Sequence, residues 1–204
     1  MTTSQPSERG AGRAVERVVL LGRDGEPVGE ADKAAVHGAS TPLHLAFSCY
    51  AFDRSGRLLV TRRSREKRTF PGTWTNTCCG HPAPGEAVAH AVRRRLRDEL
   101  GLEAAGLRLA LPDFAYRASA NGVEENELCP VFLCRVAADP TPDPSEVDGW
   151  HWRSWAAFVD DAASPGSELS VWSRLQVARL EEEGQVTRFL RDTPPSPPSS
   201  SRPA

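Results

Sequence analysis

The chain has 204 residues, 39% hydrophobic and 25% charged, with a formal net charge of −2. That length supports one well-packed domain, and the small net charge argues against nucleic acid or an anionic membrane as a partner. The 5 cysteines follow no framework spacing, and we find no signal peptide and no membrane-spanning run, so we expect a cytoplasmic protein with free thiols.

The two ends are Ser/Pro-rich, which predicts disordered tails at residues 1–15 and 192–204 around a single domain at 16–191. Apolar runs between turn-forming residues indicate strands, and they lie at 16–22, 43–52, 57–61, 126–136 and 149–155. The stretch Asp53-Arg54-Ser55-Gly56 predicts a hairpin turn, and Pro130 suggests an edge strand or a bulge.

Helices are expected later in the chain. One helix should run from Gly85 to Leu100, because Gly101 offers a C-terminal stop. Two further helices are expected near residues 154–161 and 167–183. Strands and helices in this order indicate an α+β domain.

Three histidines are candidates for a metal site. His37 and His44 lie close together in the sequence, and His81 follows far downstream. Each histidine by itself is more often a satisfied surface or core group. Three neutral imidazoles together would suit zinc or manganese.

Two carboxylates form the second candidate constellation. Glu125 and Glu127 are two residues apart, so in a strand they project from the same face. Such a pair repels, and either a bound cation removes the repulsion or one member stays protonated and serves as a proton donor. The commoner meaning of an acidic stretch is a solvated loop end, but the apolar residues 128–134 favour a buried sheet edge.

Two other stretches carry reactive or charged groups. Cys78 and Cys79 stand directly before Gly-His-Pro, and either could be structural, metal-binding or catalytic. The basic residues 62–68 follow a strand, and a local anion site there competes with an ordinary solvated surface.

Residues 80–102 fit the spacing of the Nudix box, with two departures. Arg95 stands where the box has Glu, and Asp98 stands where it has the next Glu. A guanidinium at a metal-gathering position reverses the charge there, so Arg95 suits direct contact with diphosphate oxygens. The segment resembles the Nudix scaffold without its hydrolytic site.

The chain closely resembles the type I isopentenyl-diphosphate isomerases over residues 17–183. The stretches that carry the resemblance are, in order, "LHLAFS", "LLVTRR", "PGTWTNTCCGHP", "RRRLRDELG", "DFAYRA" and "ENELCPVF". The resemblance implies a Nudix-like α/β/α sandwich with a mixed sheet. It also implies interconversion of isopentenyl and dimethylallyl diphosphate by protonation and deprotonation through a tertiary carbocation.

The resemblance assigns a role to each candidate residue. Cys79 and Glu127 become the facing acid–base groups, and Glu127 is the expected proton donor in the forward direction. Tyr116 would form a hydrogen bond with Glu127, and Cys78 would be a packing neighbour. The implied ligands of a manganese, zinc or magnesium ion are His37, His44, His81, Glu125 and Glu127. Glu99 would approach a magnesium ion carried by the diphosphate. The implied contacts of the prenyl diphosphate are Lys33, Arg63, Lys67 and Arg95, with Trp172 over the carbocation.

Two rival functions stay open at this point. One is a Nudix pyrophosphohydrolase, which Arg95 disfavours, and the other is a zinc-stabilised binding module, which the lack of paired Cys-x2-Cys spacing disfavours. We expect a monomer or a weak homodimer that binds a small molecule and neither nucleic acid nor membrane.

Overall fold

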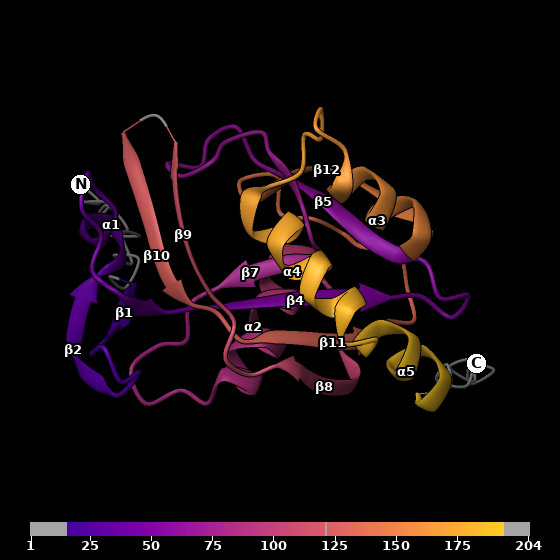
Figure 1. Cartoon of the computed structure of the whole chain (residues 1–204), viewed down its shortest axis with the longest axis horizontal. Helices are drawn as coiled ribbons and strands as arrows, with labels where there is room; N and C mark the ends of the chain where they lie inside the picture. The colour runs from indigo at the N-terminus through magenta and orange to yellow at the C-terminus, as the bar shows by residue number, and fades with distance from the viewer. Residues whose placement is uncertain (1–15, 121, 194–204) are drawn as a thin grey trace, which may run out of the picture.

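The computed structural model describes residues 16–120 and 122–193, so the predicted N-terminal tail and residues 194–204 lie outside the described part (Figure 1). The strands form two sheets. The first has the spatial order β2 (Pro27–Asp32), β1 (Arg17–Leu21), β3 (His44–Leu45), β10 (Val123–Leu128) and β9 (Ala115–Ala120). The second has the order β12 (Val147–Arg153), β5 (Leu58–Arg63), β4 (Phe47–Phe52), β11 (Val131–Arg135) and β8 (Ala105–Leu111), with β6 (Trp74–Thr75) on β5 and β7 (Cys78–Gly80) on β4. The helices are α1 (Lys33–Val36), α2 (Val88–Leu100), α3 (Trp155–Ala163), α4 (Val171–Glu182) and α5 (Gln185–Asp192).

Two chain segments cross together from the first sheet to the second. β3 lies parallel to β10, and after the crossing β4 lies parallel to β11. The Ala46 N–H donates to the Leu128 carbonyl at 2.9 Å, and the Ser48 N–H donates to the Pro130 carbonyl at 3.1 Å. The register places Glu127 beside His44, which brings two candidate ligands together.

The prediction of unbroken strands at 43–52 and 126–136 is therefore wrong. Each apolar run serves two sheets and breaks where it passes between them, at Ala46 in one and at Pro130 in the other. Pro130 does not lie on an edge strand, because it precedes β11, which lies between β4 and β8. A shift in the register between β11 and β8 follows it, between Val131 and Phe132. Since Pro130 stands between strands, its missing N–H costs no ladder bond.

Helices cover both faces of the second sheet, and the alternation of side chains along β4 shows why. Tyr50 and Phe52 point into a core shared with α3, α4 and α5, whereas Cys49 and Ala51 point into a core shared with α2. In Figure 1 the C-terminal helices lie in front of the sheet and α2 lies behind it. The α+β class and the α/β/α arrangement are confirmed.

The helix α2 starts three residues later than predicted. Gly85 has φ 77° and belongs to a turn that precedes the first helical residue, Val88. At the other end Gly101 adopts φ 64° and its N–H bonds to the Arg97 carbonyl at 2.9 Å, which confirms the predicted stop. Along α2, Arg95 and Glu99 lie on one buried face, where they form an ion pair.

The predicted helices at 154–161 and 167–183 correspond to α3 and α4, capped by Ser154 and Ser170. The short strands β6 and β7, and the elements β2, α1, β8, β9 and α5, were not predicted. Among the described helices, none is both long and apolar enough to cross a bilayer.

Candidate active site

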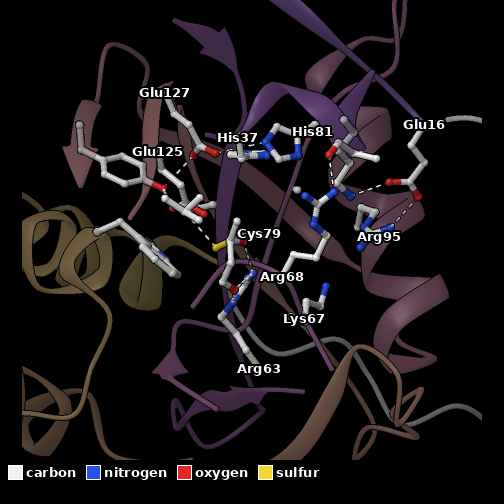
Figure 2. Close-up of a pocket in the computed structure, with 18 of the residues that line it drawn as sticks. Glu16, His37, Arg63, Lys67, Arg68, Cys79, His81, Arg95, Glu125 and Glu127 are labelled. Atoms are coloured by element: carbon white, nitrogen blue, oxygen red, sulfur yellow. Dashed lines mark hydrogen bonds and ion pairs between the residues drawn. The ribbon is translucent and has the colours of Figure 1, made fainter. Parts of the chain in front are cut away.

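A cavity of about 450 Å³ opens between β10, β7, α1 and α4. Two of the predicted site residues do not line it: His44 is completely buried, and Glu99 lies behind Arg95. The predicted residues that do line it are Lys33, His37, Arg63, Lys67, Cys79, His81, Arg95, Tyr116, Glu125, Glu127 and Trp172. In Figure 2 the carboxyl groups and the histidines lie at the top of the view, Cys79 lies at the centre, and the basic side chains lie below and to the right.

The two adjacent cysteines face opposite ways because successive residues of a strand alternate. Cys79 points into the cavity, where its sulfur lies 3.2 Å from Asn76 Oδ1 and 3.4 Å from Ser48 Oγ. Cys78 points into the core beneath α2, with its sulfur 3.8 Å from Glu99 Oε2. Burial raises the pKa of Cys79 to about 11, so its thiol is neutral at pH 7 when no ion is bound.

Glu125 and Glu127 project from β10 into the cavity with 5% and 6% of their surface exposed. Tyr116, on the neighbouring strand β9, places its hydroxyl oxygen 2.7 Å from Glu125 Oε2 and 3.0 Å from Glu127 Oε2. One phenolic proton serves only one of these contacts, so a second proton on a carboxyl group completes the arrangement.

The environments of the two carboxyl groups differ. Burial, followed by the charge of Glu127, raises the pKa of Glu125 to about 7. Burial also disfavours the charged form of Glu127, but the adjacent imidazoles of His44 and His81 outweigh it and lower its pKa. Of the two carboxyl groups, Glu125 therefore holds a proton more readily than Glu127.

A compact group of metal-ligating atoms lies beside Glu127. Among the described residues, this group consists of one atom each from His37, His44, His81 and Glu127, all within 4.8 Å of one another. Within the described part of the chain, the buried nitrogens His37 Nε2, His44 Nε2 and His81 Nδ1 lack a hydrogen-bond partner. Burial lowers the pKa of His37 to about 4, which leaves that ring neutral.

The hydrogen bonds around His44 fix its tautomer. Its Nδ1 lies 3.0 Å from the Pro42 carbonyl and donates to it, so Nε2 presents a lone pair 3.5 Å from Glu127 Oε1. Burial lowers the pKa of His44, but contacts with Glu127 outweigh it and raise the pKa overall, so protons and a cation compete there. Three imidazoles and a carboxylate fit a divalent ion. The Glu125 carboxyl group does not belong to this cluster.

The basic end of the cavity is held by carboxylates of the protein itself. Glu146 forms ion pairs with Lys67 and with Arg95, the latter at 3.3 Å. Glu16 lies 2.5 Å from Lys33 Nζ and 3.7 Å from Arg95 Nη1. These carboxylates keep the cations gathered at one place on the wall.

Arg63 also lines the cavity but is held by different groups. Its guanidinium donates to the Thr69 carbonyl at 2.9 and 3.2 Å and lies 5.7 Å from the centre of the Trp172 ring. Trp172 is 2% exposed and its Nε1–H donates to Asn76 Oδ1 at 3.1 Å. The rings of Phe70 and Tyr116 lie 5.1 and 6.0 Å from the Trp172 ring, which gives the cavity an aromatic wall.

Sequence reasoning assigned no individual role to several side chains at the site, among them Glu16, Ser48, Arg68, Asn76 and Glu146. Arg68 stood in the basic run and Asn76 in the cysteine motif, so local signals existed for both. Glu146 stands 79 residues from Lys67 along the chain, and nothing near it in the sequence signals their contact.

Comparison with known proteins gives a consistent family assignment. The NUDIX domain family matches residues 42–172. A Frankia alni protein named isopentenyl-diphosphate Delta-isomerase is 55% identical over 188 residues, covering 90% of this chain and 95% of that protein. A protein of the same name from Mycolicibacterium vanbaalenii is 56% identical over 170 residues, covering 83% of this chain and 93% of its own.

Solved structures agree with the fold. A Deinococcus radiodurans crystal structure superposes with a TM-score of 0.64 at 22% identity, covering 80% of this chain and 98% of that one. The MutT protein from Methanosarcina mazei superposes with a TM-score of 0.57 at 20% identity, covering 71% and 96%. At these identities the likeness shows the fold alone.

Proposed function

Since the chain belongs to the isopentenyl-diphosphate Delta-isomerases within the NUDIX family, we propose that it interconverts isopentenyl and dimethylallyl diphosphate with Cys79 and Glu127 as its acid–base pair. The observation that carries this proposal is a thiol and a carboxyl group lining one cavity whose other end is basic. A carbon–carbon double bond is a poor base, so both proton transfers need groups held in place.

The reaction moves one proton onto the substrate and takes another away. One group of the pair gives its proton to the terminal CH2 carbon of isopentenyl diphosphate, and the π electrons form the new C–H bond. The neighbouring tertiary carbon becomes cationic. The second group then takes a proton from the carbon between that centre and the CH2–O group, and its C–H electrons form the new double bond.

The direction of the proton traffic between Cys79 and Glu127 stays a prediction. Sequence reasoning expects Glu127 to donate in the forward direction. A neutral Cys79 thiol also carries a proton that it can donate, and either order uses the same two groups.

The basic end of the cavity suits the diphosphate group. Arg63, Lys67, Arg95 and Lys33 converge there, and charge-assisted hydrogen bonds to phosphate oxygens are strong and directional. Anchoring the diphosphate at this end directs the five-carbon chain toward Cys79, Glu127 and the aromatic wall.

We further propose a manganese, zinc or magnesium ion held by His37, His44, His81 and Glu127, with Glu125 as an additional ligand. Such an ion would polarise the Glu127 carboxyl group and orient its proton. A magnesium ion would accompany the diphosphate, near Glu99. In the described structure Glu99 forms an ion pair with Arg95 and does not line the cavity, so Glu99 would contact this magnesium ion from behind the cavity wall.

The aromatic wall would protect the cationic centre. Trp172 and Tyr116 present rings to the cavity, and an electron-rich face stabilises a nearby positive charge. These rings also exclude water, which would otherwise trap the carbocation as an alcohol.

Hydrolysis of the diphosphate is disfavoured by Arg95. The guanidinium occupies a position where the Nudix box has a carboxylate, and it is buried among Glu99, Glu146 and Glu16. We propose a monomer or weak homodimer in the cytoplasm, a compartment that suits the five free cysteines.

The cysteine pair offers a matched test. Cys79→Ala should abolish formation of dimethylallyl diphosphate, whereas Cys78→Ala should keep activity within about threefold, because the Cys78 sulfur packs beneath α2 outside the cavity. Thermal unfolding checks that both variants are folded. Full activity in Cys79→Ala, or equal losses in both variants, would contradict the assignment.

A further inference from the structure

A single buried amide joins the reactive sulfur to the aromatic wall. Asn76 is 0% exposed and lies in the link between β6 and β7. Its Oδ1 is 3.2 Å from Cys79 Sγ and 3.1 Å from Trp172 Nε1. Cys79 lies on β7 and Trp172 lies on α4, 93 positions later in the sequence (172 − 79).

The orientation of this amide is fixed by its other end. The Asn76 Nδ2 group donates to the Cys49 carbonyl at 3.0 Å and to the Cys78 carbonyl at 3.0 Å. Turning the amide over would break both bonds and place an N–H donor against the Trp172 N–H donor. The oxygen therefore faces Cys79 and Trp172 in one defined way.

The indole depends on this oxygen more than the nearby hydroxyl groups do. Thr75 and Ser173 also lie within hydrogen-bond distance of Asn76 Oδ1, at 2.8 and 3.1 Å, but each can turn toward the other or toward Ser170. An indole N–H cannot turn without moving the whole ring. Within the described part of the chain, Asn76 Oδ1 is its acceptor.

The sulfur is restrained from a second direction as well. Gln176 Nε2 donates to Ser48 Oγ at 2.9 Å, and Ser48 Oγ lies 3.4 Å from Cys79 Sγ. Gln176 Oε1 accepts from the Tyr50 hydroxyl at 2.9 Å, which fixes the Gln176 amide. The sulfur therefore lies between two fixed polar groups, of which only Asn76 also reaches Trp172.

We propose that Asn76 is a positioning residue of the isomerase, whose side-chain oxygen sets the location of the Cys79 sulfur relative to the Trp172 ring. The inference rests on the proposed function, because these are the groups that would transfer a proton and face the carbocation. A displacement of a reacting group by about 1 Å can cost about 100-fold in rate. In the described structure the Asn76 side chain bonds to none of the proposed diphosphate contacts, so substrate binding should change little.

The test compares Asn76→Ala with Thr77→Val. Thr77 is the next residue and also 0% exposed, and its hydroxyl joins Ala51 N and Leu59 O without touching the thiol or the indole. Asn76→Ala should lower kcat about 100-fold with KM within about threefold of the unchanged protein. Thr77→Val should lose stability with kcat within about threefold. A kcat for Asn76→Ala within threefold of the unchanged enzyme, or equal kcat losses in the two variants, would overturn the proposal.

A measurement on the unchanged protein covers the case in which Asn76→Ala does not fold. The chain has 5 tryptophans, and the indole resonance of Trp172 is identified by its loss in Trp172→Phe. Its indole proton should resonate downfield of exposed indoles and exchange slowly with solvent. A shift and exchange rate typical of an exposed indole would overturn the proposal. This readout needs no turnover, so it separates failure of the positioning role from failure of the isomerase assignment.

Discussion

Tyr116→Phe removes one hydroxyl group and leaves the rest of the site in place. The phenylalanine ring keeps the contacts with Phe114 and Trp172, whose ring centres each lie 6.0 Å from that of Tyr116. The lost hydroxyl lies 2.7 Å from Glu125 and 3.0 Å from Glu127, so the change removes a hydrogen bond to an ionised carboxyl group.

The size of the effect follows from the charge of the partner. A hydrogen bond to a charged group contributes about 1.5–3 kcal/mol. At about 1.4 kcal/mol for each factor of ten, its loss from the transition state lowers kcat/KM about 10- to 150-fold. Steady-state assays of dimethylallyl diphosphate formation measure this directly.

Tyr50→Phe is the matched control, since these are the two tyrosines of the chain. The Tyr50 hydroxyl is also buried but donates to the neutral Gln176 amide at 2.9 Å, away from the carboxyl pair. Its loss should cost about 1 kcal/mol of unfolding free energy. It should lower kcat/KM less than Tyr116→Phe does, because Tyr50 reaches Cys79 only through Gln176 and Ser48. If Tyr116→Phe retains full kcat/KM, or if both variants lose it equally, the hydroxyl does not act on the carboxyl groups as described.

Three further outcomes are expected. In EDTA-treated protein, the rate at which iodoacetamide alkylates Cys79 should rise with pH, with a midpoint near 11. The reason is that the thiolate is the reactive form and burial raises the pKa of Cys79 from 9.0. A midpoint at or below pH 9 would contradict this. Lys67→Met should raise KM about 10- to 100-fold, because it removes a charged contact with the diphosphate. Arg65→Met is the control and should leave KM unchanged, because the Arg65 side chain is 80% exposed. Equal KM values for the two variants would show that Lys67 does not bind the diphosphate. The amount of bound metal, measured by mass spectrometry, should fall in His44→Ala. It should not fall in His90→Ala, which changes an exposed histidine. An undiminished metal content in His44→Ala would show that His44 is not a ligand.

The sequence predicts the chemistry of the site better than the paths that its strands take. Cys79 and Glu127 belong to specific motifs, and alternation along a strand tells which face each residue shares with its neighbours. The break at Ala46 carries no comparable signal, because the apolar run continues on both sides while the chain changes from one sheet to the other. The position of the break becomes evident only in the structure, where the Ala46 N–H donates to the Leu128 carbonyl of the second segment that crosses between the sheets.

Contacts between segments that are distant in the sequence could not be predicted from local sequence patterns either. The helix α2 could be predicted with its stop at Gly101, but not that Arg95 would meet Glu146, 51 residues later. Asn76 was visible in the cysteine motif, yet its role emerges only when α4 brings Trp172 onto its side-chain oxygen. Local pattern identifies reactive groups, and tertiary packing determines which groups hold them.

The most direct test of the account follows isopentenyl diphosphate by NMR in heavy water with magnesium and the unchanged protein. Proton transfer through Cys79 and Glu127 predicts dimethylallyl diphosphate with deuterium bonded to carbon. Release of phosphate without deuterium at carbon would instead identify a hydrolase, and an unchanged substrate would contradict the isomerase assignment.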